Sequence, residues 1–140
     1  MEYFDTNIYI YAFCNNIDDK NQKEISKKLI REAVQNNTII VSEMILYEFA
    51  FASKKLKEND IFIEQNLDFL SQFVKLTSAK INQRVVEILK ISKQYTSSFD
   101  LFHLAFCEYN NCKLITFDKG FKKLQNLSKI ELIILNNKNE

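Results

Sequence analysis

The alternation of strand-like and helix-like stretches along the chain constrains its fold more than any other feature. Short runs rich in β-branched and aromatic residues predict strands at residues 1–5, 38–42, 73–77, 112–118 and 129–137. Apolar residues at helical spacing predict helices between them, at residues 7–13, 20–34, 44–56, 61–73, 81–89 and 96–110. Strands that alternate with helices are typical of an α/β fold, in which helices cover both faces of a parallel sheet.

The length and composition of the chain fit one globular domain. With 140 residues, of which 46% are hydrophobic, the chain is long enough to bury a core. It contains no internal repeat, low-complexity tract or linker, so we expect a single domain over residues 1–140. The formal net charge of +1 argues against a polycation that wraps nucleic acid by charge alone.

The sequence carries no signal for secretion or membrane insertion. Acids stand at positions 2 and 5, where a signal peptide would be basic, and no apolar run approaches the ~18 residues of a membrane span. The three cysteines, Cys14, Cys107 and Cys112, form no CxxC pair, so we expect buried free thiols rather than a zinc site or a disulfide framework. These features predict a cytoplasmic protein that does not associate with membranes.

Four acids differ from the others, which fit solvated helix faces. Asp5 interrupts the hydrophobic start of the chain, Glu48 lies within "MILYEFAFA", Asp100 opens "FDLFHLAF" and Asp118 ends "KLITFD". In a parallel α/β sheet, ligands bind beyond the carboxyl ends of the strands, where we expect Asp5 and Asp118. Asp100 joins them if its helix begins at that edge. Glu48 stays near the edge because it follows Ser42 by about two helical turns.

Carboxylates that converge in this way repel one another, and the repulsion raises their pKa values. A divalent cation removes the difficulty, and oxygen ligands without clustered His or Cys favour Mg²⁺ or Mn²⁺ over zinc. Such a cation activates water and stabilises the charge that develops on a phosphate. The four acids therefore predict a site for Mg²⁺ or Mn²⁺ that acts on phosphate groups.

Three of the four acids also have purely structural explanations. Asp100 is the third residue after Ser97, so "SSFD" fits a capping box. Asp118 begins "DKG", which is typical of a turn, and Glu48 fits a solvent-facing position on a helix. Asp5 has no such explanation, because it belongs to no turn dipeptide and caps no evident helix.

Three stretches carry these acids in a characteristic order. "YFDTNIYIYAF" contains a hydrophobic residue, Asp5, Thr and Asn, and "VSEMILYEFAF" combines a strand and a Ser with a helix that bears Glu48. "SSFDLFHLAFCEYNNCKLITFDKGF" places Asp100 before a Leu-Ala helix and Asp118 at the end of a strand, in the pattern Thr-x-Asp-x-x-Phe. In their order and spacing, these stretches resemble the motifs of the PIN-domain family, and within it the ribonuclease toxins of the VapC type.

The resemblance covers nearly the whole chain and implies a PIN-like three-layer α/β/α sandwich with a five-stranded parallel sheet. It implies a Mg²⁺- or Mn²⁺-dependent endoribonuclease, with Asp5, Asp100 and Asp118 as metal ligands and Glu48 as the fourth catalytic residue. It also implies a toxin that forms a homodimer and is inhibited by a cognate antitoxin. One departure is position 120, where this chain has Gly and some relatives carry a further acid.

In this interpretation, RNA phosphodiesters are hydrolysed by metal-activated water. Glu48 binds the metal through water or orients the attacking water. Glu43 is the alternative for this role, but it stands at the start of a helix, where an acid stabilises the helix dipole. Three further side chains are expected to hydrogen-bond the carboxylates: Thr6, Asn7 and Thr116.

Other residues near the expected edge have weaker claims to function. We expect His103, one turn after Asp100, to be a packing or hydrogen-bonding residue rather than a metal ligand. The aromatic residues at positions 9, 11 and 13 are expected in the core or at a dimer surface. Five lysines are candidates to receive the RNA backbone, although a solvated face explains each at least as well: Lys54, Lys55, Lys119, Lys122 and Lys123.

Two other classes of function remain open. One is a non-catalytic PIN-like module that binds RNA or a protein, which the presence of all four acids disfavours. The other is a phosphoryl-transfer protein with an acid at the end of its first strand. A haloacid-type phosphatase would carry a second Asp two residues after Asp5, but position 7 is Asn. A receiver domain would carry an acidic pair before its phospho-acceptor strand, and none is evident.

Overall fold

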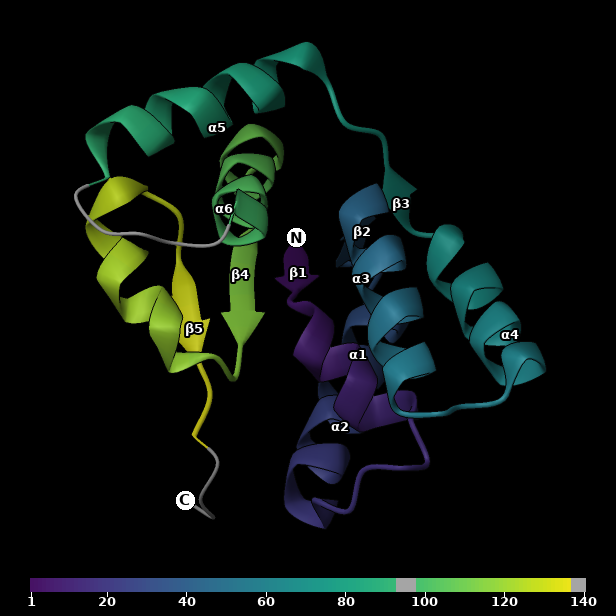
Figure 1. The fold of residues 1–140 in the computed structure, drawn as a ribbon. Helices are drawn as coiled ribbons and strands as arrows, with labels where there is room; N and C mark the ends of the chain where they lie inside the picture. The colour runs from purple at the N-terminus through teal and green to yellow at the C-terminus, as the bar shows by residue number, and fades with distance from the viewer. Residues whose placement is uncertain (93–97, 137–140) are drawn as a thin grey trace.

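All of the predicted strands lie in one sheet. The computed structural model describes residues 1–92 and 98–136, and within them five strands pair in the order β3-β2-β1-β4-β5 (Figure 1). Every neighbouring pair is parallel. The strands are β1 (Glu2–Phe4), β2 (Ile39–Ser42), β3 (Val74–Lys75), β4 (Lys113–Thr116) and β5 (Leu132–Ile134). The predicted parallel sheet is therefore confirmed, with strands shorter than the sequence patterns that predict them.

The helices lie in two layers on either side of the sheet. They are α1 (Thr6–Phe13), α2 (Lys20–Gln35), α3 (Glu43–Lys55), α4 (Asp60–Ser71), α5 (Ala79–Ile91), α6 (Ser98–Asn110) and the 3₁₀ helix η1 (Lys119–Leu127). From β1 the chain moves outward to β2 and β3, then returns past β1 to β4 and β5. Connections between parallel strands are right-handed as a rule, and with this strand order they put α1–α4 on one face and α5, α6 and η1 on the other. The helix contacts agree, since α1 packs on α2 and α3, α3 on α4, and α5 on α6. Figure 1 shows α5 against α6, apart from the group of α1–α4, so the three-layer prediction is confirmed.

The central strand β1 packs against both helix layers and holds them together. Tyr3 and Phe4 are completely buried, and because neighbouring side chains of a strand point to opposite faces, each serves one layer. Tyr3 packs on Phe106 of α6 with ring centroids 4.9 Å apart, and Phe4 packs edge-on against Tyr9 of α1 at 6.1 Å. Asp5 follows directly, so the strand that anchors the core also fixes the position of this carboxylate.

Asn, Asp, Ser and Lys shape the helix ends in a chain with one glycine and no proline. The side chains of Asp19, Ser42 and Asn59 accept backbone N–H groups at the starts of α2, α3 and α4. Residues of positive φ follow three helices and take the place that glycine usually fills: Asn37 (φ 55°), Lys57 (φ 60°) and Asn111 (φ 56°). The cap predicted at Ser97 lies outside the described residues.

The structure can also be compared with the predictions about the cysteines and about membrane-spanning segments. Cys14, Cys107 and Cys112 are buried free thiols, as predicted. Within residues 1–92 and 98–136, no helix combines the length and apolar character needed to cross a bilayer.

Candidate active site

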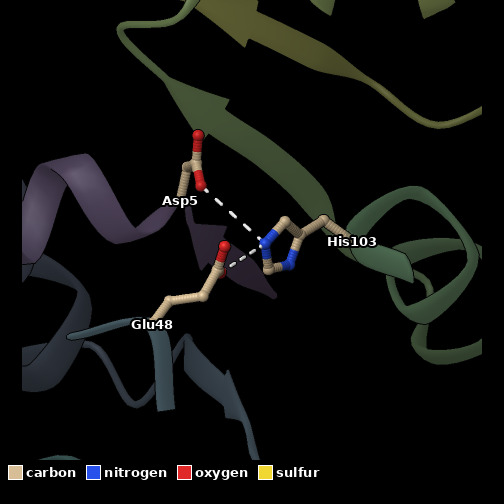
Figure 2. Close-up of side chains that lie close together, drawn as sticks. All are labelled: Asp5, Glu48 and His103. Atoms are coloured by element: carbon tan, nitrogen blue, oxygen red, sulfur yellow. Dashed lines mark hydrogen bonds and ion pairs between the residues drawn. The ribbon is translucent and has the colours of Figure 1, made fainter. Parts of the chain in front are cut away.

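The four predicted acids lie at the carboxyl end of the sheet, and two of them, Asp5 and Glu48, come close together with His103. Asp5 follows β1, Asp118 lies two residues beyond the end of β4, Glu48 lies on α3 after β2, and Asp100 lies in the first turn of α6. Figure 2 shows the side chains of Asp5 and Glu48 converging on His103. The charges of Asp5, Glu48 and Asp118 all act on Asp100, so the four acids share one electrostatic environment.

Asp5 combines a structural and an electrostatic role. It is the N-cap of α1, and its Oδ1 accepts the N–H of Thr6 at 2.8 Å. The sequence interpretation that Asp5 caps no helix is therefore wrong, because strand β1 passes into α1 without an intervening loop. Its Oδ2 accepts the hydroxyl of Thr116 at 2.7 Å. Even with these bonds, burial raises the pKa of Asp5 above its usual value, so an ionised carboxylate here benefits from a nearby cation.

Thr116, the last residue of β4, connects Asp5 with Asp118. Its hydroxyl donates to Asp5 and accepts the backbone N–H of Asp118 at 2.9 Å, while Asn7 Nδ2 donates to the same oxygen at 3.3 Å. Asp118 is exposed and accepts the N–H of Gly120 at 2.8 Å, so it also has the turn role that the sequence left open. A Cβ at position 120 would lie 3.0 Å from Asp118 Oδ1, and a residue larger than Gly would require that carboxylate to shift.

Glu48 is held by two donors on one of its carboxylate oxygens. Thr6 Oγ1 donates to Glu48 Oε1 at 2.8 Å, and His103 Nε2 lies 2.7 Å from the same atom (Figure 2). Burial by itself raises the pKa of Glu48, but the hydrogen bonds from His103 and Thr6 bring it below its usual value. Glu48 is thus kept ionised at the edge of the site.

His103 is completely buried and contacts two acids. Its Nε2 lies 3.9 Å from Asp5 Oδ1 as well as 2.7 Å from Glu48 Oε1. Burial alone lowers the pKa of His103, but the hydrogen bond to Glu48 and the charges of Asp5, Glu48 and Asp100 outweigh it and raise the pKa. The sequence predicts a packing or hydrogen-bonding role for His103, and the structure shows hydrogen bonds at both ring nitrogens. Its spacing of three residues from Asp100 was the only sign that it faces the acids.

Asp100 is the half-buried acid of the group. Burial, reinforced by the charges of Asp5, Asp118 and Glu48, raises its pKa from 3.8 to about 6. A carboxylate with this pKa loses much of its charge only slightly below neutral pH. The repulsion predicted from the sequence is therefore present, and a bound cation would relieve it.

These shifts predict how the stability of the metal-free protein depends on pH. A carboxyl group whose pKa is higher in the folded than in the unfolded protein makes folding more favourable as pH falls through the folded pKa. The raised pKa values of Asp100, Asp5 and His103 all act in this direction. In EDTA, the thermal midpoint should rise between pH 7.5 and 5.5, and Asp100→Asn should reduce that rise. Calorimetry that shows the same slope in both proteins would contradict the assignment of Asp100.

The donor set is compatible with a divalent cation. One ligand atom each from Asp5, Glu48 and His103 lies within 4.8 Å of the others. Both imidazole nitrogens of His103 already have hydrogen-bond partners, whereas Asp5 Oδ1 accepts one of the bonds described above and Glu48 Oε2 accepts none, so both oxygens keep a lone pair. The oxygen-rich character of the site therefore fits a hard cation better than zinc.

Several other predicted residues lie in different surroundings. Glu43 Oε1 accepts the N–H of Thr77 at 3.3 Å, so its described contact ties α3 to the segment after β3. Lys54 pairs with Asp60 on the exposed surface between α3 and α4. The remaining lysines of the predicted group are exposed, Lys55 on α3 and the others on η1, directly after Asp118: Lys119, Lys122 and Lys123.

Comparisons with known proteins agree with the family resemblance of the sequence motifs. A family model described as PIN domain matches residues 3–127. Ribonuclease VapC2 from Methanocaldococcus jannaschii is 28% identical in an alignment of 154 positions that covers 93% of each chain. Among solved structures, VapBC2 from Rickettsia felis, bound to a DNA fragment from its promoter, contains a chain that superposes with a TM-score of 0.71. That alignment covers 97% of this chain and 100% of the other at 22% identity, a likeness of fold.

Proposed function

The chain belongs to the PIN domain family, and from this premise we propose that it is a metal-dependent endoribonuclease, the toxin of a toxin–antitoxin pair. The observation that carries the proposal is the convergence of Asp5, Glu48, Asp100 and Asp118 at the carboxyl end of the parallel sheet. The similarity to a protein named as a ribonuclease supports the same reaction.

In this proposal, three of the acids hold Mg²⁺ or Mn²⁺: Asp5, Asp100 and Asp118. The bound cation would supply a Lewis acid that favours attack by water and offsets the charge developing on the phosphate. Glu48, kept ionised by His103 and Thr6, orients the attacking water through its carboxylate. The Thr116 hydroxyl links the Asp5 carboxylate to the backbone N–H of Asp118.

The proposed partners follow from the relatives and the charge distribution. A chain of similar fold occurs in a VapBC2 complex, which supports an antitoxin as the protein partner. The exposed lysines of η1 stand beside Asp118, where they would meet the RNA backbone. The free cysteine thiols are consistent with the cytoplasm, and we propose a homodimer by analogy with the family.

The proposal is tested by incubating the purified chain with RNA and comparing Mg²⁺ or Mn²⁺ with EDTA. We expect fragments to accumulate with either cation, to be absent in EDTA and to return when the cation is added in excess. Cleavage that persists in EDTA would contradict metal dependence. An intact substrate at saturating cation, with the protein folded, would instead favour the non-catalytic module.

A further inference from the structure

An unbroken chain of hydrogen bonds leads from the core to Glu48. Ser42 Oγ lies 2.7 Å from the hydroxyl of Tyr3, and that hydroxyl lies 2.6 Å from Nδ1 of His103. The other nitrogen of the same ring, Nε2, lies 2.7 Å from Glu48 Oε1. Three of the four residues in this chain of hydrogen bonds are completely buried, since Ser42, Tyr3 and His103 are each 0% exposed.

The direction of these hydrogen bonds follows from what each group can donate. An ionised carboxylate only accepts, so the proton between His103 and Glu48 lies on Nε2. In the neutral ring, Nδ1 accepts from the Tyr3 hydroxyl, and the Tyr3 oxygen accepts from Ser42. In the charged ring, Nδ1–H donates to the Tyr3 oxygen, and the Tyr3 hydroxyl donates to Ser42. The oxygen of Ser42 in turn accepts the backbone N–H of Ile45 at 3.3 Å, which ties the chain to the first turn of α3. Every group in the chain has a partner.

We propose that His103 is a positioning residue that holds the Glu48 carboxylate, and that Tyr3 and Ser42 fix the orientation of its ring. The inference rests on the proposed function, because it assigns a partner to the residue that orients the water. It gives a reason for an imidazole in an otherwise apolar part of α6. Nearby on the same helix, Leu101, Leu104 and Ala105 are at most 1% exposed.

The arrangement has a consequence for the geometry of Glu48. Oε1 is occupied by His103 and by Thr6, which donate from α6 and α1 respectively. Two donors from different elements restrict rotation of the carboxylate, so Oε2 is left as the oxygen that can meet water. An outer partner of this kind usually contributes a factor of about 10–100 in metal affinity or activity.

The competing interpretation makes His103 a direct metal ligand, and NMR separates the two. His103 is the one histidine of the chain, so a long-range ¹H–¹⁵N spectrum of the imidazole needs no assignment. We expect a protonated Nε2 that stays protonated when Mg²⁺ is added to saturation, and whose resonance moves in Glu48→Gln. Loss of the Nε2 proton upon addition of Mg²⁺, or a spectrum unchanged in Glu48→Gln, would overturn the proposal.

Two substitutions at position 103 provide the kinetic test. The amide of His103→Gln can donate to Glu48 from a place close to that of Nε2, whereas His103→Leu fills the space without a donor. We expect kcat for RNA cleavage to fall about 10–100-fold in His103→Leu with KM nearly unchanged, and to recover most of that loss in His103→Gln. Equal loss in two folded variants, or full activity in His103→Leu, would overturn the proposal.

A third variant, outside position 103, tests the proposal even if the variants at position 103 do not fold. Tyr3→Phe keeps the ring that packs on Phe106 and removes only the hydroxyl next to His103. We expect its kcat to fall several-fold, with a shifted imidazole resonance and an intact fold. An unshifted resonance would remove Tyr3 from the proposal. The NMR test involves no RNA, so an inactive wild-type chain would refute the proposed function without deciding the role of His103.

Discussion

Asp5→Asn should abolish RNA cleavage while leaving the fold intact. Asn occupies the same volume and is an equally good N-cap, so α1 should begin as before. The variant loses the negative charge that would hold the cation at the centre of the site. A metal ion contributes several kcal/mol to the stabilisation of charge in such a transition state, and each 1.36 kcal/mol corresponds to a tenfold rate. We therefore expect a loss of about 1000-fold, measured as the initial rate of RNA cleavage in Mg²⁺.

Stability distinguishes this effect from damage to the protein. Because burial raises the pKa of Asp5, its ionised form destabilises the metal-free protein at neutral pH. Asp5→Asn should therefore melt at the same or a higher temperature than wild type in EDTA, and it should lose the stabilisation that Mn²⁺ gives to wild type. Asp68→Asn is the matched control, since Asp68 is exposed on α4 and should tolerate the same change without effect. Wild-type cleavage by Asp5→Asn would refute the mechanism.

Glu48→Gln should reduce cleavage about 100-fold, whereas Glu43→Gln should stay within about threefold of wild type. Misplacing the attacking water by about 1 Å can cost about 10²-fold, and a neutral amide in place of Glu48 binds that water less strongly than a carboxylate does. Gln would also have to turn its amide oxygen toward His103 and Thr6, which leaves its NH₂ group facing the site. Glu43→Gln makes the same chemical change on the same helix, but the described contact of the Glu43 side chain is with the backbone N–H of Thr77 and not with the acids of the site.

The pair of variants decides between the two glutamates considered from the sequence. The measurement is kcat and KM on one RNA, with the midpoint of urea unfolding recorded for each protein. Equal loss in both variants would indicate a general effect of charge on α3. A large loss only in Glu43→Gln would reverse the assignment.

The fold was predictable because the patterns that specify it are local. The strands at residues 38–42 and 112–118 are apolar runs of a length typical of buried parallel strands, and both are found in the sheet. The four acids were noticeable because each interrupts or ends such a run. Asp5 shows where local reasoning fails. The sequence patterns placed Asp5 within the first strand and began the helix at residue 7, whereas α1 begins at Thr6, and so the cap was missed.

The partners of Glu48 could not be predicted, because they depend on contacts between distant segments. Tyr3 looks like an ordinary core residue, and its hydroxyl acquires a role only because α6 packs over β1 and brings His103 to it. Ser42 caps α3 through local contacts, but its contact with Tyr3 depends on the pairing of β1 with β2. The 3₁₀ helix η1 was also missed, although Phe121, Leu124 and Leu127 recur at intervals of three residues, the spacing at which side chains of a 3₁₀ helix align.

The most direct test of the central claim measures cation binding and RNA cleavage in the same sample. Free Mn²⁺ is followed by electron paramagnetic resonance while the cleavage rate is recorded during a titration. If Asp5, Asp100 and Asp118 hold the catalytic cation, the rate should rise in proportion to the bound Mn²⁺ and level off when the site is full. Both signals should be lost together in Asp5→Asn. A saturated site without cleavage, or cleavage that precedes binding, would contradict the account.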